Sequence, residues 1–366
     1  MKDALLTAVG LAGVALALVD VFYTVLFPAS GHGPLREPLA RGLRAAFRLA
    51  RHLRDEDRRR RVLSYAGPLQ VAVTLTVWFS LLLVAWAIVY RPALGGSIVA
   101  ASGETDVGWG TALYYSGYVL TTLGMGDVVA TTATYRIATV AEAATGFAVT
   151  TLVISYFISV YTTLTSRNAF AMALHHRSAG TGRGERVVAR LWSEGEAAAA
   201  GHLAEMAANL RSVTQTHRAY PVLRSFHYRH DYDGLPLILL TCLETSALLR
   251  STVASGGDSP FGGRTALRGS AVDELHHAAL TMCRQVLGSP ATEEPSEATK
   301  RLWREHHRRI LLDLIDAGVP VCRDATDAYI ADRSTWDGPL AVLTTALMYA
   351  WPEALRATPG AIPRQP

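Results

Sequence analysis

The chain has 366 residues, half of them hydrophobic, with a mean hydropathy of +0.19 and a formal net charge of +4. This length is typical of about two domains, and so modest a charge gives no reason to expect a nucleic-acid partner. The three cysteines, Cys242, Cys283 and Cys322, have no paired spacing, which argues against a disulfide framework and against a zinc site.

Three apolar segments are long enough to cross a membrane as helices, since about 30 Å of hydrocarbon requires roughly 20 residues. They cover residues 4–27, 67–90 and 135–165. Residues 108–127, between the second and third segments, are too short to cross and return, and therefore predict a re-entrant loop. Non-helical backbone is tolerated at that depth only where protein buries it or where it lines a water-filled cavity.

The distribution of arginine predicts the orientation. Residues 29–66 contain ten arginines, whereas residues 91–134 contain one. By the positive-inside rule the first loop is cytoplasmic and the second is external. The N-terminus is therefore expected outside and the C-terminal half in the cytoplasm of a bacterial cell, with the chain in the plasma membrane. A cleaved signal peptide over residues 1–19 is the alternative, but the single Lys2 is a weak positive region and apolar sequence continues to Phe27.

The arginine-rich loop also has a helical pattern, because leucine, phenylalanine and alanine recur at spacings of three and four residues over 35–50. Its arginines fall largely on other faces of that helix. One interpretation is a basic amphipathic helix on the anionic inner leaflet, and the other is a helix packed against the cytoplasmic domain. The arginines expected at the leaflet are Arg36, Arg41, Arg44, Arg48 and Arg51.

An aromatic-rich segment at residues 112–120 leads into a short glycine-containing motif. The motif consists of Thr121, Thr122, Leu123, Gly124, Met125, Gly126 and Asp127. Two glycines one residue apart permit backbone conformations that are closed to most residues, and these can turn successive carbonyls toward one axis. With the flanking apolar spans, residues 112–127 resemble the pore helix and selectivity filter of the potassium channel family, whose pattern is T-x-G-[YFL]-G-D.

The resemblance implies a homotetramer, because one loop per chain cannot enclose an ion. It also implies that K⁺ replaces its water shell with the carbonyls of Thr122, Leu123, Gly124 and Met125, next to Gly126, with no other cofactor. Asp127 is expected at the outer mouth, where carboxylates concentrate cations, or as a cap for nearby backbone. Met125 departs from the usual Tyr, Phe or Leu. Methionine is flexible and has no hydroxyl, so strict selectivity for K⁺ over Na⁺ is in question.

The third span extends the resemblance through Glu142 and Gly146, which match the E-x-x-x-G of many bacterial inner helices. Glu142 is expected behind the filter, hydrogen-bonded to the pore helix, since an unpaired carboxylate in lipid is costly. Gly146 serves either as a hinge or as a site of close helix packing. The residues expected to line the inner cavity are Thr150, Thr151, Ile154 and Ile158.

Asp20 lies within the first span, where an acidic residue is a functional candidate by default. A structural partner is favoured, either Tyr23, Thr24 or an arginine of the following loop. No span carries arginine at every third position, so a voltage sensor is not expected.

The C-terminal half is predicted to be an all-α domain. Residues 166–184 suggest a glycine-rich linker, and helical patterns occur near 185–217, 235–250, 270–287, 297–317 and 338–350. Loops are expected at 256–260 and 288–290. Ten of the twelve histidines lie in this half. They are interpreted mainly as residues on solvated helix faces, with proton sensing near neutral pH as the alternative. His227 and His230, three residues apart, could share a helix face, but no carboxylate or cysteine completes a convincing set of metal ligands with them.

The sequence thus predicts an all-α membrane protein that is not an enzyme. The expected domains are an N-terminal transmembrane helix at 1–28, a basic segment at 29–66, a pore domain at 67–165, a linker at 166–184 and a helical cytoplasmic domain at 185–366. The expected function is a tetrameric potassium channel gated by its cytoplasmic domain through an unknown ligand. The alternatives are a weakly selective cation channel and a membrane-anchored sensor or scaffold whose pore does not conduct.

Overall fold

A computed structural model describes residues 1–27, 33–49, 55–228, 231–253, 270–287, 294–322 and 324–349. Nearly all regular structure in this part of the chain is helical, as predicted. The chain divides into two compact units. The first, which we call the membrane unit, comprises Met1–Phe47 and Ala66–Tyr161, and the second, the C-terminal unit, comprises Arg48–Tyr65 and Thr162–Pro366.

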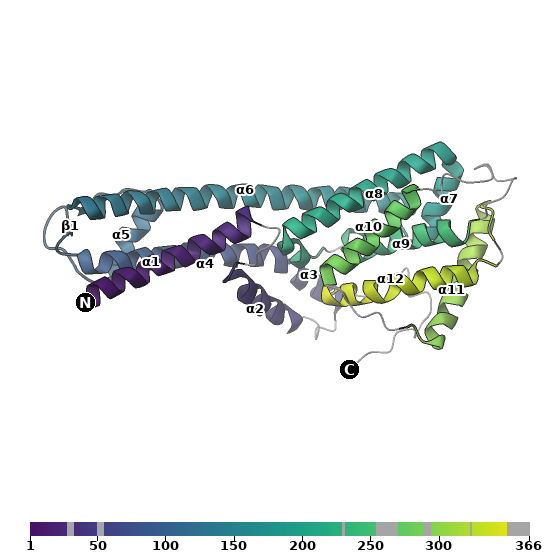
Figure 1. Ribbon diagram of the computed structural model, residues 1–366, viewed down its shortest axis with the longest axis horizontal. Coiled ribbons are helices and arrows are strands. Elements are labelled where there is room, and N and C mark those ends of the chain that lie inside the picture. Colours follow the sequence, from purple (N-terminus) through teal and green to yellow (C-terminus); the bar gives the residue numbers. More distant parts are fainter. Residues whose placement is uncertain are drawn as a thin grey trace. The chain divides into compact units, whose positions relative to one another are not determined.

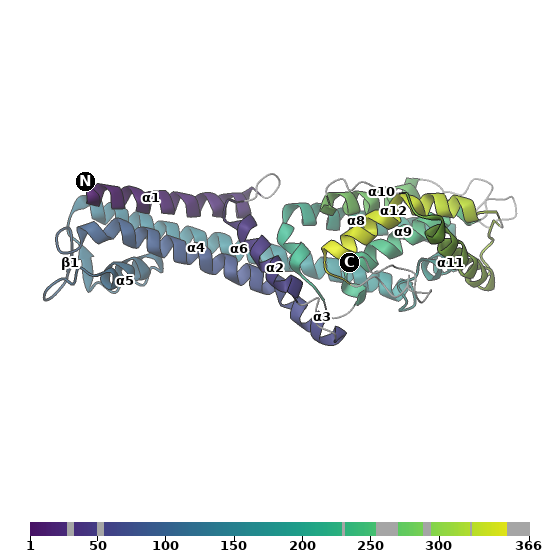
Figure 2. The same cartoon turned by 90° about the horizontal axis from the view of Figure 1, so that it is seen from below.

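The membrane unit contains three long apolar helices. Helix α1 (Lys2–Val21) continues into a short π-helical turn, η1 (Phe22–Leu26), while α4 (Ala66–Tyr90) and α6 (Ala133–Arg177) supply the other two. Each is long and apolar enough to cross a membrane, which agrees with the three predicted spans. Figures 1 and 2 show α1 lying along α4 in both views.

Small residues bring α1 and α4 close together. A Cβ atom on Gly10 of α1 would lie 2.6 Å from Val89 Cγ2 and 2.7 Å from the Ala85 carbonyl oxygen. Apolar helices in lipid gain little from burying apolar surface against each other, so close packing at small residues provides much of the attraction. Gly10 therefore permits the close approach of α1 to α4.

Asp20 has structural partners near the C-terminal end of α1. Its side chain is fully buried, and its carboxylate accepts hydrogen bonds from Trp78 Nε1 at 2.6 Å and from the Leu35 amide at 2.8 Å. A structural role was predicted, but neither of these partners was named. Trp78 lies 58 residues away in sequence, so the pair depends on how α1 packs on α4.

The arginine-rich loop contains two separate helices, α2 (Arg36–Arg48) and α3 (Glu56–Ser64). In α2, Glu37 lies 3.7 Å from Arg41 and 3.1 Å from Arg44. Arg41 and Arg48 are exposed. The Arg36 side chain and all of Arg51, both predicted to meet the leaflet, lie outside the described residues. Helix α3 clusters with the C-terminal unit, so the basic segment is divided between the two units.

The segment between α4 and α6 contains elements that the sequence patterns did not indicate. After the short helix η3 (Arg91–Ala93), strand β1 (Ile98–Ala100) pairs antiparallel with β2 (Val128–Ala130), with Val99 opposite Val129. The strands flank helix α5 (Trp109–Leu120) and the motif that follows it. They therefore tie together the two ends of the re-entrant segment.

The C-terminal unit is a helical bundle built around one buried helix (Figures 1 and 2). Helix α9 (Leu235–Ser251) is buried along almost its whole length. Helices α7 (Gly184–Glu194), α10 (Ser270–Leu287) and α12 (Thr326–Ala346) pack against it. The other elements that follow α6 are α8 (Glu196–Ala219), η4 (Pro221–Ser225), η5 (Asp231–Asp233) and α11 (Glu297–Asp316).

Three boundaries differ from the prediction. Most of the predicted linker 166–184 is helical, because α6 extends to Arg177 and buries Phe170 and Leu174 in the core of the C-terminal unit. The predicted helix 185–217 is divided at Gly195, whose φ of +86° ends α7. The last helix begins at Thr326, well before the predicted residue 338. The loops predicted at 256–260 and 288–290 lie outside the described residues.

The interpretation of the histidines as solvated was wrong for half of those in the C-terminal half. His217, His227, His276, His306 and His307 are buried. Burial lowers the pKa of His217 to about 3, and it lowers the pKa values of His276 and His307 to about 4. These three rings are therefore neutral near pH 7, which also argues against them as neutral-pH proton sensors. His230 lies outside the described residues.

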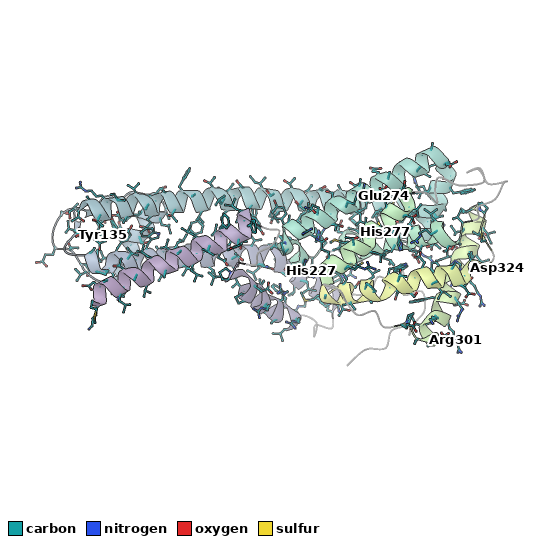
Figure 3. All side chains as sticks on the ribbon, viewed as in Figure 1. Tyr135, His227, Glu274, His277, Arg301 and Asp324 are labelled. Carbon is teal, nitrogen blue, oxygen red and sulfur yellow. The ribbon has the colours of Figure 1, made fainter. Side chains whose placement is uncertain are left out.

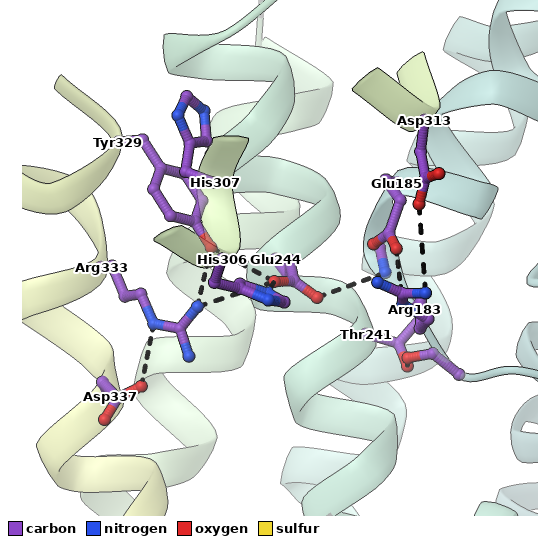
Figure 4. A network of polar contacts seen from close by, with 12 residues as sticks. Arg183, Glu185, Thr241, Glu244, His306, His307, Asp313, Tyr329, Arg333 and Asp337 are labelled. Atoms are coloured by element: carbon purple, nitrogen blue, oxygen red, sulfur yellow. Dashed lines mark hydrogen bonds and ion pairs between the residues drawn. The ribbon is translucent and has the colours of Figure 1, made fainter. Parts of the chain in front are cut away.

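A buried polar cluster occupies the centre of the bundle (Figure 4). Glu244 of α9 accepts a hydrogen bond from Tyr329 at 3.2 Å and lies 3.0 Å from His306 Nε2 and 3.8 Å from Arg333. Burial alone would raise the pKa of Glu244, but the hydrogen bond from His306 and the charge of Arg333 outweigh it and lower the pKa. Glu244 is thus a compensated buried charge joining three helices.

Glu185 of α7 belongs to the same cluster and is less well compensated. Its side chain is 1% exposed, and its Oε1 lies 2.6 Å from Arg183 Nε. Burial and the negative charge of Glu244 raise the pKa of Glu185 to about 7. The folded chain therefore holds the Glu185 proton at a pH where an unfolded chain, with a pKa near 4.5, has released it.

We expect Glu185→Gln to stabilise the C-terminal unit above pH 7 and to leave it unchanged below about pH 4.5. Protonated Glu185 contributes to the stability of the folded C-terminal unit, and this contribution is fully present below pH 4.5 and is lost as the pH rises through about 7. That pKa difference corresponds to about 3 kcal/mol at high pH. Hydrogen exchange of α9 amides in the full-length protein, corrected for intrinsic rates, measures the gain in stability of Glu185→Gln over the wild type at pH 5 and pH 8. An equal gain at both values would contradict a titration effect.

Candidate functional site

Helix α5 holds the re-entrant segment against α4. It begins after Gly108, where Asp106 accepts hydrogen bonds from the Gly108 amide at 2.9 Å and from Thr111 Oγ1 at 2.8 Å. Side chains on one side of the helix, including Tyr115 and Ser116, are buried in the membrane unit. Residues 108–127 thus form a short helix followed by a non-helical stretch, as a re-entrant loop would.

The backbone after α5 alternates in handedness. Thr122, Gly124 and Gly126 have φ values of +57°, +64° and +77°, whereas Leu123 and Met125 between them have negative φ. In a strand, successive carbonyls point to opposite sides. Reversing the handedness at every second residue instead turns successive carbonyls toward the same side. We therefore expect the two glycines and the strained Thr122 to align the carbonyl oxygens of this stretch in a row.

These carbonyls remain available for a ligand. The amides of Thr122 and Leu123 donate to the carbonyls of Val119 and Tyr118 at 2.9 Å and 2.8 Å, which fixes the start of the row on the end of α5. Within the described residues, no protein group donates a hydrogen bond to the carbonyl oxygens of residues 122–126. The whole stretch 121–127 is exposed in the single chain. Carbonyl oxygens are the ligand type that monovalent cations prefer.

Tyrosines anchor the far end of the row. Tyr114 of α5 donates a hydrogen bond to Asp127 Oδ2 at 2.9 Å, and the Val128 amide donates to Asp127 Oδ1 at 3.1 Å. Tyr118 donates to the Val128 carbonyl. Asp127 thus both caps local backbone and stays exposed. The aromatic-rich pattern of residues 112–120 did not indicate the bond from Tyr114 to Asp127.

The aromatic cluster extends behind the row. The Tyr115 ring lies 5.3 Å from Tyr118 and 4.9 Å from Tyr90, both edge-on. Tyr135, near the start of α6 and labelled in Figure 3, lies 6.5 Å from Tyr90. Edge-to-face rings are rigid contacts that add to the energy of apolar burial. The cluster therefore holds α4, α5 and α6 together beside the row of carbonyls.

Glu142 of α6 is fully buried behind α5. Its Oε1 accepts a hydrogen bond from Ser116 Oγ at 2.6 Å, and the same hydroxyl lies 3.0 Å from the Leu83 carbonyl. Ser116 therefore links the inner helix α6, the pore helix α5 and the outer helix α4. The sequence analysis placed Glu142 at this position but gave Ser116 no role.

Gly146 is a point of close packing between α6 and the end of α5. A Cβ atom at Gly146 would lie 1.9 Å from the Leu120 carbonyl oxygen and 2.9 Å from the Leu120 carbonyl carbon. Helix α6 runs unbroken from Ala133 to Arg177 through this position. Glycine is therefore required here for packing, which favours the second of the two predicted roles.

The residues expected to line an inner cavity are exposed in the single chain. Ile154 is 55% and Ile158 is 60% exposed. Thr150 and Thr151 donate hydrogen bonds to the carbonyls of Gly146 and Phe147 at 2.8 Å and 2.9 Å, so their hydroxyls are satisfied by their own helix. Among the filter side chains, Leu123 is 67% and Met125 is 57% exposed.

The part of the chain that the structure describes contains no group of three or more His, Cys, Asp or Glu side chains able to hold a metal ion.

Comparison with known proteins agrees with the site geometry. Residues 74–163, which include most of α4, all of α5, the carbonyl row and much of α6, match a family model described as an ion channel. The chain is 29% identical over 222 residues to "Uncharacterized membrane protein YdjJ" from Bacillus subtilis (strain 168). This match covers 60% of the chain and 62% of that protein, so the chain spans less than two thirds of its relative. No solved structure matches the chain.

The matched region coincides with two membrane helices and the short helix between them, which is the arrangement that the sequence predicts. The chain is therefore an all-α membrane protein that contains, over residues 74–163, a region similar to the ion channel family.

Proposed function

We propose that the protein is a homotetrameric potassium channel whose filter is formed by residues 122–126. The alternating backbone handedness at Thr122, Gly124 and Gly126, which aligns carbonyls that none of the described protein groups occupies, carries this proposal. Rings of carbonyls from Thr122, Leu123, Gly124 and Met125 would hold dehydrated K⁺. A dehydrated ion loses its water shell, so it requires an equivalent set of oxygens at each step along the filter.

Assembly into a tetramer follows from the exposure of the filter in the single chain. One row of carbonyls contacts an ion from one side only, and irregular backbone is not stable in lipid. Four chains around one axis would complete each ring and remove residues 121–127 from lipid. The four Asp127 carboxylates, each positioned by Tyr114, would form a ring that raises the local concentration of cations.

The inner helices would form the wall below the filter. The side chains of Thr150, Thr151, Ile154 and Ile158 are exposed in the single chain, as residues facing a central cavity would be. Each threonine hydroxyl donates to its own helix and keeps both oxygen lone pairs as acceptors. Gly146 and Glu142 would support the filter from behind.

The orientation and regulation follow from charge and chain order. The arginines of residues 29–66 favour a cytoplasmic location for that loop, with the N-terminus outside and the C-terminal unit in the cytoplasm. Arg41, Arg44 and Arg48 of α2 would meet the anionic inner leaflet. Because α6 continues without a break from the pore domain into the C-terminal unit, a ligand bound by that unit could gate the pore.

A weakly selective cation channel is the second candidate, and Met125 is the observation that favours it. Met125 is 57% exposed and has no hydroxyl to anchor it to a pore helix. We expect Met125→Tyr to keep the tetramer and to leave the preference for K⁺ over Na⁺ equal or higher, because a tyrosine hydroxyl can bond to a neighbouring pore helix. Reversal potentials in mixed K⁺ and Na⁺ measure this. A clear fall in preference with the tetramer intact would mean that the filter is built differently.

Ion flux into liposomes that contain the purified protein tests the proposed function. We expect K⁺ to enter faster than Na⁺ and Ba²⁺ to block the flux, because a divalent ion of similar size would lodge between the carbonyl rings. Flux without preference would favour the weakly selective channel. The absence of flux from correctly assembled protein would favour a sensor or scaffold with a non-conducting pore.

A further inference from the structure

Residues 178–183, which we call the α6–α7 loop, join the end of α6 to the start of α7 within the C-terminal unit. Gly180 and Gly182 have φ values of +80° and +68°, a conformation that permits a tight turn. The Thr241 hydroxyl of α9 lies 2.8 Å from the Gly182 carbonyl and 2.9 Å from the Leu237 carbonyl of its own helix, and it donates to both. The loop is therefore docked on the buried helix α9 by a side chain of that helix.

Two glycines allow the loop and the first turn of α7 to approach α9 closely. A Cβ atom at Gly182 would lie 3.0 Å from Leu237 Cδ1. One at Gly184 would lie 2.8 Å from both the Thr245 amide nitrogen and Glu244 Cγ. The Gly184 amide also donates a hydrogen bond to Glu244 Oε2 at 3.4 Å. The start of α7 is thus held directly against a buried carboxylate.

The α6–α7 loop directly follows the helix that lines the proposed pore. Helix α6 runs unbroken from Ala133 to Arg177, and its last turns bury Phe170 and Leu174 in the core of the C-terminal unit. The loop therefore contributes to how firmly the C-terminal end of α6 is attached to α9. A signal that loosens the loop acts on the helix that carries the proposed cavity residues.

Two buried carboxyl groups lie where the start of α7 contacts α9 (Figure 4). Glu185 of α7 and Glu244 of α9 are each 1% exposed. Glu185 Oε1 lies 2.6 Å from Arg183 Nε, and Arg183 Nη1 lies 4.0 Å from Asp313 Oδ2 of α11. The guanidinium of Arg183 is therefore shared between two carboxylates, while Glu185 also experiences the negative charge of Glu244.

Glu244 has further partners that hold its negative charge. His306 Nε2 of α11 lies 3.0 Å from Glu244 Oε1, and Tyr329 and Arg333 of α12 lie 3.2 Å and 3.8 Å from the same oxygen. Burial raises the pKa of Glu244, but the hydrogen bond from His306 and the charge of Arg333 outweigh burial and lower it. Glu244 is therefore a carboxylate near neutral pH, and it repels a second negative charge on Glu185.

Glu185 is the group in this cluster that exchanges a proton near neutral pH. Burial, Glu244 and Asp313 raise its pKa to about 7, against the lowering effect of Arg183. Above pH 7 the folded unit either holds a second buried carboxylate or opens so that water reaches it. The stability that protonated Glu185 gives to docking is fully present below pH 4.5 and is lost as the pH rises through about 7.

We propose that the α6–α7 loop is a proton-dependent switch, in which protonated Glu185 keeps the loop docked on α9 and ionised Glu185 favours its release. Release brings Glu185 and Arg183 into water and loosens the attachment of the end of α6. The inference rests on the proposed function in one respect, since it names the proton as the signal that the C-terminal unit passes to the pore. Docking itself can be measured without ion flux.

Hydrogen exchange of the full-length protein in detergent, followed by mass spectrometry, measures how often the loop opens. We expect the opening equilibrium constant of residues 178–190, corrected for intrinsic exchange rates, to rise about tenfold from pH 6 to pH 8. This factor follows from a pKa of about 7 in the docked state and of 4.5 in the open state. A constant that does not rise would overturn the switch.

Helix α10 is the internal reference that separates opening of the loop from unfolding of the whole unit. Its amides should stay more protected than residues 178–190, and low concentrations of denaturant should leave the exchange of residues 178–190 unchanged. Exchange of the two segments at the same rate would show that Glu185 acts on the whole unit, and this would also overturn the switch.

Glu185→Gln is the principal variant, because glutamine resembles the protonated carboxyl in shape and cannot ionise. We expect its opening constants at pH 6 and pH 8 to agree within about twofold. Glu305→Gln removes an exposed carboxyl of α11 in the same unit, so it is the matched control and should keep the tenfold rise. Loss of the rise in both variants, or in neither, would overturn the assignment to Glu185.

Two other variants test the switch even if Glu185→Gln does not fold. Arg183→Gln removes the positive charge that lowers the pKa of Glu185, so the rise in opening should move to higher pH. Thr241→Val removes the hydroxyl bond to the Gly182 carbonyl and should increase opening roughly threefold at both pH values. A rise that stays at the same pH in Arg183→Gln, or unchanged opening in Thr241→Val, would contradict the proposed docking.

Flux of K⁺ into liposomes at pH 6 and pH 8 tests the connection of the switch to the pore. We expect the wild-type flux to differ by about fivefold or more between the two pH values, and the flux of Glu185→Gln to be the same at both. Equal pH dependence in the two proteins would overturn the role of Glu185 in gating. No flux at either pH from assembled protein would contradict the proposed channel, and the exchange measurements would still decide the switch.

Discussion

Gly124→Ala is expected to abolish potassium conductance. Gly124 has a φ of +64°, which an alanine adopts only at a cost of roughly 1–2 kcal/mol per chain. A Cβ atom at this position would meet no other atom within 4 Å, so the effect comes from the backbone and not from a clash within the chain. Relaxation of this φ would rotate the neighbouring carbonyls away from the axis in four chains at once.

Gly110→Ala is the matched control. Gly110 lies in the first turn of α5 with helical backbone, and a Cβ atom there would also meet no other atom within 4 Å. Liposome flux of K⁺ should therefore be near wild type in Gly110→Ala and absent in Gly124→Ala, with both proteins tetrameric. Normal conduction by Gly124→Ala would mean that the aligned carbonyls do not form the ion pathway.

Gly146→Ala is expected to prevent correct assembly of the pore, whereas Gly124→Ala is expected to affect only conduction. The new Cβ would lie 1.9 Å from the Leu120 carbonyl oxygen, and backbone cannot move aside as a flexible side chain can. Overpacking of this kind typically costs about 1–3 kcal/mol per site. Leu120 lies two residues before the proposed filter, so its displacement would shift Thr121 and Thr122 as well.

Size-exclusion chromatography with light scattering, followed by the flux assay, measures this result. We expect fewer tetramers, and no K⁺ flux from those that form. Gly42→Ala in α2, where a Cβ would have open space, provides the control and should assemble normally. A Gly146→Ala channel that assembles and conducts but opens differently would restore the interpretation of Gly146 as a hinge.

Much of the pore domain could be predicted because its signals are local. The length of an apolar run determines whether it can span a membrane, and residues 67–90 differ from α4 by one residue at the start. The motif with Gly124 and Gly126 specifies the backbone that the structure shows, since few other sequences tolerate alternating φ. Strong local constraints such as these do not depend on the rest of the fold.

The contacts that support the filter could not be predicted in the same way. The hydrogen bonds of Trp78 with Asp20 and of Ser116 with Glu142 join separate helices, and helix rotation is not determined by one sequence. Strands β1 and β2 are three residues each, too short for an alternating pattern to stand out.

In the C-terminal unit, the burial of the histidines could not be predicted from the sequence. Its histidines lie in polar stretches such as residues 304–309, so their local pattern indicates solvent exposure. His306 and His307 are nevertheless buried, because Glu244 and Thr252 of the α9 region provide hydrogen-bonding partners. Tertiary partners decide whether a polar side chain can be buried, and they become visible only once the bundle is assembled.

Anomalous diffraction from crystals of the tetramer soaked in rubidium tests the central claim most directly, since Rb⁺ resembles K⁺ and can be located. We predict peaks on the fourfold axis, between successive rings of carbonyl oxygens from Thr122, Leu123, Gly124 and Met125. Peaks only at the carboxylates of Asp127, or no peak on the axis, would contradict a carbonyl filter in these residues.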